Sequence, residues 1–170
     1  MRWTCAERTV ELGEHFNVCK DCIVCREFGA LTEFPVIPFG KMIYFASPYS
    51  HPDKSVVSER FVSVVKACGW LMVNVPEVQM FYSPIAHTHP IAEYSTLPGG
   101  WEYWMTCDKT ILSRCSEIWV YCISGWTKSV GVNAERKIAA EYGLGVKFVI
   151  PLPNGTYQIT ETEPSGNVGE

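Results

Sequence analysis

The spacing of apolar residues predicts strands that alternate with helices from residue 41 onward. Apolar runs of strand type begin at Lys41, Val78, Glu117 and Val146, and the third of them is apolar almost throughout. Such unbroken runs are typical of strands that are buried on both faces of a parallel sheet. The sequence therefore predicts an α/β fold, with a parallel sheet of four to five strands and helices on both of its faces.

Three segments between these runs have the periodicity of helices. Residues 53–68 form an amphipathic pattern, with Asp53 as the expected N-cap and Gly69 as the expected stop. The other two helices are expected over residues 101–116 and within residues 125–143.

The remaining segments predict the domain organisation. Residues 1–40 are expected to form a short Cys-rich extension that ends in the breaker-rich EFPVIPFG. Residues 41–152 form the predicted α/β domain, and residues 153–170 are a tail that adds a short hairpin. The polar stretch 87–100, HTHPIAEYSTLPGG, is expected to be a long loop that serves a site.

Two carboxylates occupy positions that the predicted helices would bury. Glu135 lies on the helix face of Ile138, Ala139 and Tyr142. Asp108 stands in the middle of the stripe Trp101, Trp104, Met105, Ile111, Leu112 and Cys115. Burying an ionised carboxylate unpaired costs several kcal/mol, so a single case is often a structural residue with its own partner. Two such acids on helices that flank one strand indicate a site.

Paired carboxylates in an apolar cleft suit chemistry at a glycosidic carbon. One carboxylate attacks or stabilises an oxocarbenium-like centre, and the other manages the proton of the leaving group. Apolar surroundings raise the pKa of a carboxyl group, so that one of the two can stay protonated near neutrality. Trp101, Tyr103 and Trp104 would suit a flat heterocyclic leaving group.

Composition narrows the classes of protein that this chain can belong to. Of its 170 residues 47% are hydrophobic, and its formal net charge is −4 with no run of Lys or Arg. A broad nucleic-acid-binding face is therefore not expected. No segment approaches the ~20 apolar residues of a membrane span, and we expect a cytoplasmic protein without a membrane partner.

The eight cysteines fall into two groups. One group lies in apolar periodic segments, where reduced core cysteines are expected: Cys68, Cys107, Cys115 and Cys122. The other group offers thiols at a spacing that suits a structural zinc: Cys5, Cys19, Cys22 and Cys25, with His15 as a substitute for Cys5. A cysteine-rich extension without metal is the simpler interpretation, and no other cofactor is expected.

Three stretches together resemble the nucleoside 2-deoxyribosyltransferase superfamily: MIYFASPYS, DKTILSRCSEIWVYCISGW and SVGVNAERKIA. The segment SPIAHTHPI is similar to a phage and bacterial branch of uncharacterised domains in that superfamily. The resemblance covers about residues 41–150 and implies a flavodoxin-like or Rossmann-like fold. It also implies an enzyme, often a homo-oligomer, that cleaves the N-glycosidic bond of nucleosides or nucleotides.

The resemblance assigns roles to three residues. Glu135, in SVGVNAE, matches the glutamate nucleophile, and Asp108 matches the aspartate that protonates the departing base. Tyr44 matches the tyrosine that orients the nucleophile. The two acids are the same ones that the helix pattern places on apolar faces.

Ser129 departs from the pattern of the nucleoside transferases, which usually have an aspartate at this place to contact the 5′-hydroxyl. A serine and the amides of Val130 and Gly131 at a helix N-terminus would accept a 5′-phosphate that an aspartate would repel. We therefore expect a hydrolase of (deoxy)nucleoside 5′-monophosphates. A nucleoside 2-deoxyribosyltransferase is the alternative.

Further residues are candidates for substrate binding. Ser47 and Ser50 would supply hydroxyls to the phosphate, and Arg60 would supply positive charge unless it lies across its own helix. Trp104 would face the base, and either His87 or His89 would line the base or sugar pocket unless both are ordinary loop residues.

Two other functions fit the same sequence. A module that binds or sequesters nucleotides would keep the pocket without turnover. An interaction protein would use the Cys-rich extension and keep the α/β domain as a scaffold.

Overall fold

The computed structural model describes residues 3–5, 8–10, 40–96 and 101–165. The chain divides into two compact units, Met1–Phe39 and Gly40–Glu170. In the first unit, β1 (Trp3–Cys5) pairs antiparallel with β2 (Arg8–Val10).

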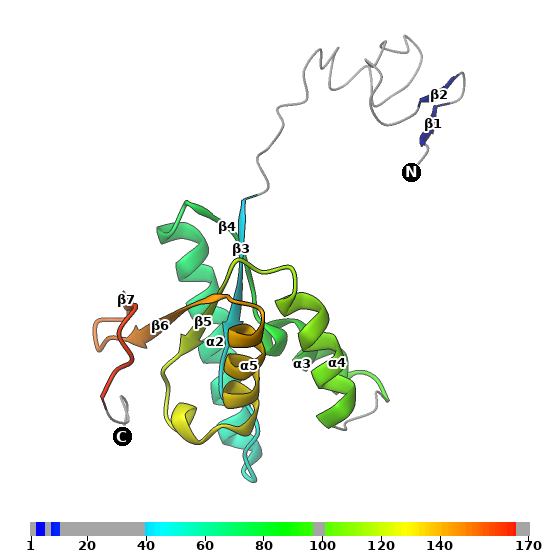
Figure 1. Ribbon diagram of the computed structural model, residues 1–170. Coiled ribbons are helices and arrows are strands. Elements are labelled where there is room, and N and C mark those ends of the chain that lie inside the picture. Colours follow the sequence, from blue (N-terminus) through cyan, green and yellow to red (C-terminus); the bar gives the residue numbers. More distant parts are fainter. Residues whose placement is uncertain (1–2, 6–7, 11–39, 97–100, 166–170) are drawn as a thin grey trace. The chain divides into compact units, whose positions relative to one another are not determined.

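The second unit is built on a five-stranded sheet in the order β4-β3-β5-β6-β7 (Figure 1). Its strands are β3 (Lys41–Ala46), β4 (Val78–Tyr82), β5 (Glu117–Tyr121), β6 (Gly145–Pro151) and β7 (Tyr157–Thr160). The first four are parallel, as the sequence predicts, whereas β7 runs antiparallel to β6. The predicted α/β class is confirmed. The sheet is mixed because the expected hairpin of the tail adds its last strand, and its order is that of a flavodoxin-like fold.

Helices cover both faces of this sheet (Figure 1). One face packs against α2 (Lys54–Asn74), with Val64, Ala67 and Leu71 buried on it. The opposite face packs against α4 (Trp101–Leu112) and α5 (Val130–Glu141), which contact each other. The short helix α3 (Pro84–Glu93) contacts α2. None of the described helices is long and apolar enough to cross a membrane.

Gly69 does not end helix α2, contrary to the prediction from the sequence. Helix α2 continues to Asn74, because Leu71 is completely buried and Val75 carries the C-cap. A glycine in a helix interior costs only about 1 kcal/mol relative to alanine, and the burial of the following turn outweighs it.

The predicted polar loop 87–100 is wrong in its first half. Residues 87–93 belong to α3, which begins at Pro84 behind the N-cap Ser83, whose hydroxyl accepts from the Ala86 amide at 3.3 Å. A capping serine followed by a proline at the first helical position favours a helix start. Pro90, which suggested a loop, sits in the last turn of α3.

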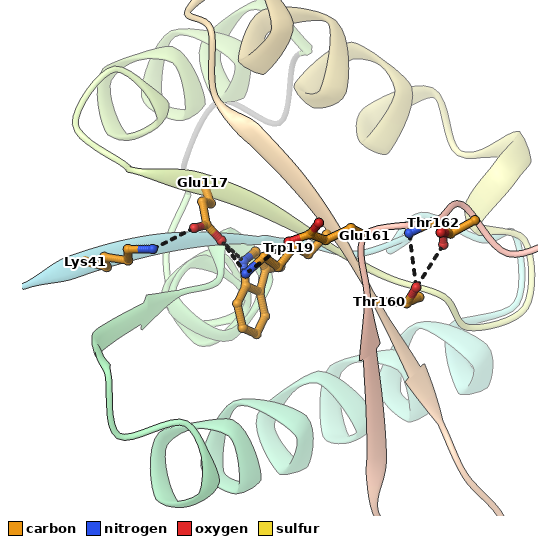
Figure 2. Close-up of polar contacts among 7 residues, drawn as sticks. Lys41, Glu117, Trp119, Thr160, Glu161 and Thr162 are labelled. Carbon is orange, nitrogen blue, oxygen red and sulfur yellow. Dashed lines mark hydrogen bonds and ion pairs between the residues drawn. The ribbon is translucent and has the colours of Figure 1, made fainter.

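A polar cluster joins the amino ends of β3 and β5 (Figure 2). Glu117 accepts from Lys41 Nζ through Oε1 at 3.0 Å and from Trp119 Nε1 through Oε2 at 2.7 Å, and Lys147 Nζ lies 3.5 Å from the same Oε2. Burial raises the pKa of Glu117, but these donors outweigh it and the net pKa is lowered. The cluster lies at the amino ends of the strands, whereas the cavity of the candidate active site opens at their carboxyl ends.

Candidate active site

A cavity of about 530 Å³ opens at the carboxyl ends of β3 and β5. The chain leaves β3 towards β4 and leaves β5 towards β6, on opposite sides of this strand pair. Ligands of open α/β sheets bind at such a switch point, outside the carboxyl ends of the strands. The cavity wall contains residues from both loops, 47–50 and 125–131, together with side chains of α3 and α4.

Glu135 lies in this cavity wall, on the buried face of α5. The helix begins behind Ser129, whose hydroxyl accepts from the Val132 amide at 3.3 Å. Only 7% of Glu135 is exposed. Its Oε1 accepts a hydrogen bond from the Tyr44 hydroxyl at 2.9 Å, whereas Oε2 is buried without a partner. The carboxyl group is therefore held by a hydrogen bond at one oxygen and has no partner at the other among the described residues.

Tyr44 is the group that links the carboxylates to the sheet. It is completely buried on β3 and faces α4 and α5. Burial raises its pKa well above the ordinary value, and so do the charges of Glu135 and Asp108, both of which interact with its hydroxyl. Tyr44 therefore remains a neutral hydrogen-bond donor at any physiological pH.

Asp108 lies on α4 and lines the same cavity as Glu135. It is half-buried, less than its position in the apolar stripe predicts, because one side of it faces the cavity. Burial raises its pKa, and the interaction with Tyr44 acts in the opposite direction. Neither carboxylate has a cationic partner among the residues that the structure describes.

The two carboxyl groups influence each other's protonation. The pKa of Glu135 is raised to about 8, first by burial and then by the charge of Asp108, whereas the hydrogen bond from Tyr44 lowers it. Neighbouring acids of this kind titrate as a pair. With a pKa of about 8, Glu135 keeps its proton at neutral pH, and a carboxyl pair that carries one proton suits a reaction with one nucleophile and one general acid.

Polar and positively charged groups line part of the cavity. Ser47, Ser50, Ser129 and Gly131 all line it, as the sequence predicts for a phosphate-binding side. Only 6% of Ser47 is exposed, and its Oγ is buried without a hydrogen-bond partner. Of the three buried side-chain polar atoms without partners in the described chain, two belong to residues that line this cavity, namely Ser47 Oγ and Glu135 Oε2.

Arg60 lines the cavity too, but its guanidinium donates to backbone carbonyls. It donates to Tyr49 O at 3.3 Å, to Ser50 O at 2.9 Å and to Ser124 O at 3.1 Å. The alternative that it lies across its own helix is therefore wrong. The side chain instead joins the loops that follow β3 and β5.

Apolar side chains also line the cavity. Trp104 lines it together with Pro84, Ile85 and Ala92. His89 also lines it, stacked on Phe61 with ring centroids 4.1 Å apart.

The two histidines of the HTHP motif lie in different places. His87 is exposed and lies against the ring of Tyr82 instead of the cavity. His89 accepts or donates a 2.5 Å hydrogen bond with the Tyr49 hydroxyl through Nδ1. Its Nε2 lies 3.6 Å from Glu93, one turn further along α3. His89 therefore fixes the loop after β3 against α3.

Several cavity residues were not predicted from the sequence, and Tyr49 and Lys128 are the two that matter most for the chemistry. Tyr49 stands in the ASPYS segment next to the predicted serines, and Lys128 directly precedes Ser129. A basic residue immediately before a predicted helix start was the signal that could have identified Lys128.

The cysteines of the α/β unit are free thiols, with Cys115 and Cys122 buried and Cys68 and Cys107 half-buried. Burial raises the pKa of the Cys68 thiol to about 11. Among the described residues no three His, Cys, Asp or Glu side chains converge as metal ligands. Cys19, Cys22, Cys25 and His15 lie outside the described residues, and Cys5 falls in β1, so the zinc site stays a prediction.

No curated protein matches the chain. A family model described as "Domain of unknown function (DUF1937)" matches residues 41–150, which span the sheet from β3 to β6 and the whole described cavity wall. The chain therefore belongs to the DUF1937 family.

Proposed function

We propose that this protein hydrolyses the N-glycosidic bond of a (deoxy)nucleoside 5′-monophosphate, with Glu135 as the nucleophile. One observation carries the proposal. Glu135 lines a ligand-sized cavity together with Asp108; its Oε2 is buried without a partner among the described residues, while Tyr44 holds Oε1. Such a free carboxylate oxygen beside a second acid suits attack on a glycosidic carbon.

The proposed reaction needs one proton on the two carboxyl groups, with Asp108 protonated and Glu135 ionised when the bond is cleaved. Glu135 Oε2 forms a bond to C1′ while the C1′–N bond breaks, and Asp108 gives its proton to the departing base. Water then attacks C1′, Asp108 takes a proton from that water, and the ester bond to Glu135 breaks. Glu135 is released as a carboxylate and Asp108 is protonated again, so both groups return to their starting states.

The proposed mechanism requires that substrate binding moves this proton from Glu135 to Asp108. With the cavity empty, Glu135 has the raised pKa of about 8 and holds the proton near neutrality. Positive charge that develops at C1′ stabilises ionised Glu135, and so does the Tyr44 hydrogen bond. The same raised pKa supports a second candidate function, a nucleotide-binding module in which Glu135 remains protonated and no turnover occurs.

Release of free base decides between these functions. Purified protein is incubated with a panel of nucleosides and nucleoside 5′-monophosphates, and free base is measured by chromatography. We expect release from monophosphates by the wild type and a loss of roughly 10³-fold or more in E135Q. Binding without release would support the binding module, and formation of a new nucleoside in the presence of a second base would identify a transferase.

Matched variants control for structural damage. Glu141 is an exposed carboxylate on the same helix as Glu135, and Glu102 is an exposed carboxylate on the same helix as Asp108. E141Q and E102Q should release base at the wild-type rate. If E135A also did so, Glu135 would not be the nucleophile.

A further inference from the structure

Two cationic side chains, Arg60 and Lys128, line the cavity. Neither forms an ion pair with a carboxylate among the described residues. The two differ in how far their N–H groups are already used by the protein, and this difference separates their roles.

The guanidinium of Arg60 is hydrogen-bonded to backbone carbonyls. Its Nη1 donates to two carbonyls of the loop after β3, and its Nη2 donates to Ser124 O in the loop after β5. The planar fork of a guanidinium can hold several acceptors in fixed directions, which an ammonium cannot do. The neighbouring Gly125 has a φ of 84°, and a Cβ built on it would lie 3.1 Å from Arg60 Nη2. The loop after β5 is thus shaped to receive this side chain.

The side chain of Lys128 makes no comparable contacts among the described residues. Lys128 belongs to the 3-10 turn η1 (Trp126–Lys128), and its ammonium has no hydrogen-bond or ion-pair partner in the part of the chain that the structure describes. The turn that carries it is anchored by Trp126, which is completely buried. Lys128 therefore presents a free positive charge from a fixed base.

In the described part of the chain, the backbone donors of Val130 and Gly131, next to Lys128 in the cavity wall, also have no hydrogen-bond partners. Val130 and Gly131 open the 12-residue helix α5, and the helix bonds start only with Asn133 N–H to Ser129 O at 3.1 Å. Their amides and the helix dipole favour an anion. Independently, Ser47 lines the same cavity, and its Oγ is buried without a hydrogen-bond partner among the described residues. A tetrahedral oxyanion would supply acceptors to all of these groups.

We infer that Lys128 is the residue that selects an anionic 5′-substituent on the substrate, and that Arg60 is a positioning residue that holds the two loops of the cavity. The identity of the substrate rests on the proposed function, whereas the division of roles between the two cations does not. A phosphate in this place meets Lys128, Ser47 and the first amides of α5, and Arg60 keeps the loops that carry them together.

The test compares a nucleoside 5′-monophosphate with its matched nucleoside in wild type, K128M, K128R and R60K. The values of kcat/KM are measured for both substrates, and the Kd values are measured by calorimetry in an E135Q background, where turnover is blocked. We expect K128M to lower the monophosphate-to-nucleoside ratio by roughly 10- to 100-fold, the range of one charge-assisted contact. K128R should keep most of that ratio, because it keeps the charge.

R60K should act differently. It should weaken binding and cleavage of both compounds by the same factor, leaving the ratio unchanged, and it should speed amide hydrogen exchange in residues 47–50 and 124–125. A ratio that falls in R60K as far as in K128M, or that stays at the wild-type value in K128M, would overturn the inference. The proposed function fails separately, when the wild type releases no base although the calorimetric ratios behave as expected.

Discussion

The Tyr44 hydroxyl donates a 2.9 Å hydrogen bond to Oε1 of Glu135, and the two residues are 91 positions apart in the chain. Tyr44 belongs to β3 and Glu135 to α5, so the bond exists only because α5 packs on the face of the sheet to which Tyr44 points. Both residues are buried, and the bond leaves Oε2 as the one unpartnered oxygen of the carboxyl group. This arrangement distinguishes Glu135 from a buried acid that is satisfied by its surroundings.

Y44F tests this relationship. The ring volume is kept, but Glu135 loses the hydrogen bond that favours its ionised form, so its pKa should rise further above about 8. We expect kcat for base release to fall by roughly 10- to 100-fold with a small change in KM. An unchanged kcat together with an unchanged pH profile would show that the bond has no part in the reaction.

The pH profile of base release should be bell-shaped, because the active form holds one proton. Above about pH 8 the pair loses its last proton and no general acid remains. Below the raised pKa of Asp108 both groups are protonated and no nucleophile remains. D108N removes the acid and also the charge that raises the pKa of Glu135, so the slow residual rate should lack the alkaline decline near pH 8. Initial rates between pH 4 and pH 10 on a substrate with a good leaving group would show both limbs.

E135Q should be more stable than the wild type, and increasingly so as pH rises. The pKa of Glu135 is about 8 in the folded protein and about 4.3 in an unfolded chain, so the folded state binds more protons between these values. Stability of the wild type therefore falls through this window, by at most about 1.4 kcal/mol per pH unit. The difference in Tm between E135Q and wild type should grow from pH 5 to pH 8 and then level off. A difference that does not vary with pH would mean that Glu135 titrates normally.

G69A should stabilise the protein. Gly69 lies inside α2 on an exposed face, and a Cβ on it would meet no atom within 4 Å. Alanine in an exposed helix interior is favoured over glycine by about 0.5–1 kcal/mol. The midpoint of urea unfolding should rise accordingly. G125A is the opposite case, because its φ of 84° and the contact with Arg60 predict a loss of stability.

E117A should destabilise the end of the sheet that lies away from the cavity. Glu117 accepts from the partly buried Trp119 Nε1, and its removal leaves that donor without its partner. We expect a loss of about 1–2 kcal/mol, and a smaller loss in E117Q, whose amide oxygen can still accept. The exposed ion pair with Lys41 adds little to this. Base release by both variants at a temperature where they are folded should match the wild type, which separates this cluster from the cavity.

The strands and the two unusual acids could be predicted because they leave local patterns. Apolar runs marked β3, β4, β5 and β6, and helical periodicity placed Asp108 and Glu135 on inward faces. The start of α3 was also encoded locally, in Ser83 and Pro84, but the polar residues after it resemble a loop. At Gly69 the sequence predicted a helix end that the structure does not have, because burial of Leu71 outweighs the weak preference of glycine for ending a helix.

What the sequence by itself determined is the alternation of strands and helices and the inward position of each acid, because both depend on residues only a few places apart. The tertiary structure alone decided that Asp108 and Glu135 share one cavity and that Tyr44 joins them. It also decided that the N–H groups of Arg60 bind three carbonyls while Lys128 has no partner among the residues that the structure describes. These relationships depend on the order of strands in the sheet, which sets the groups that meet across distances of many residues and which no short-range pattern records.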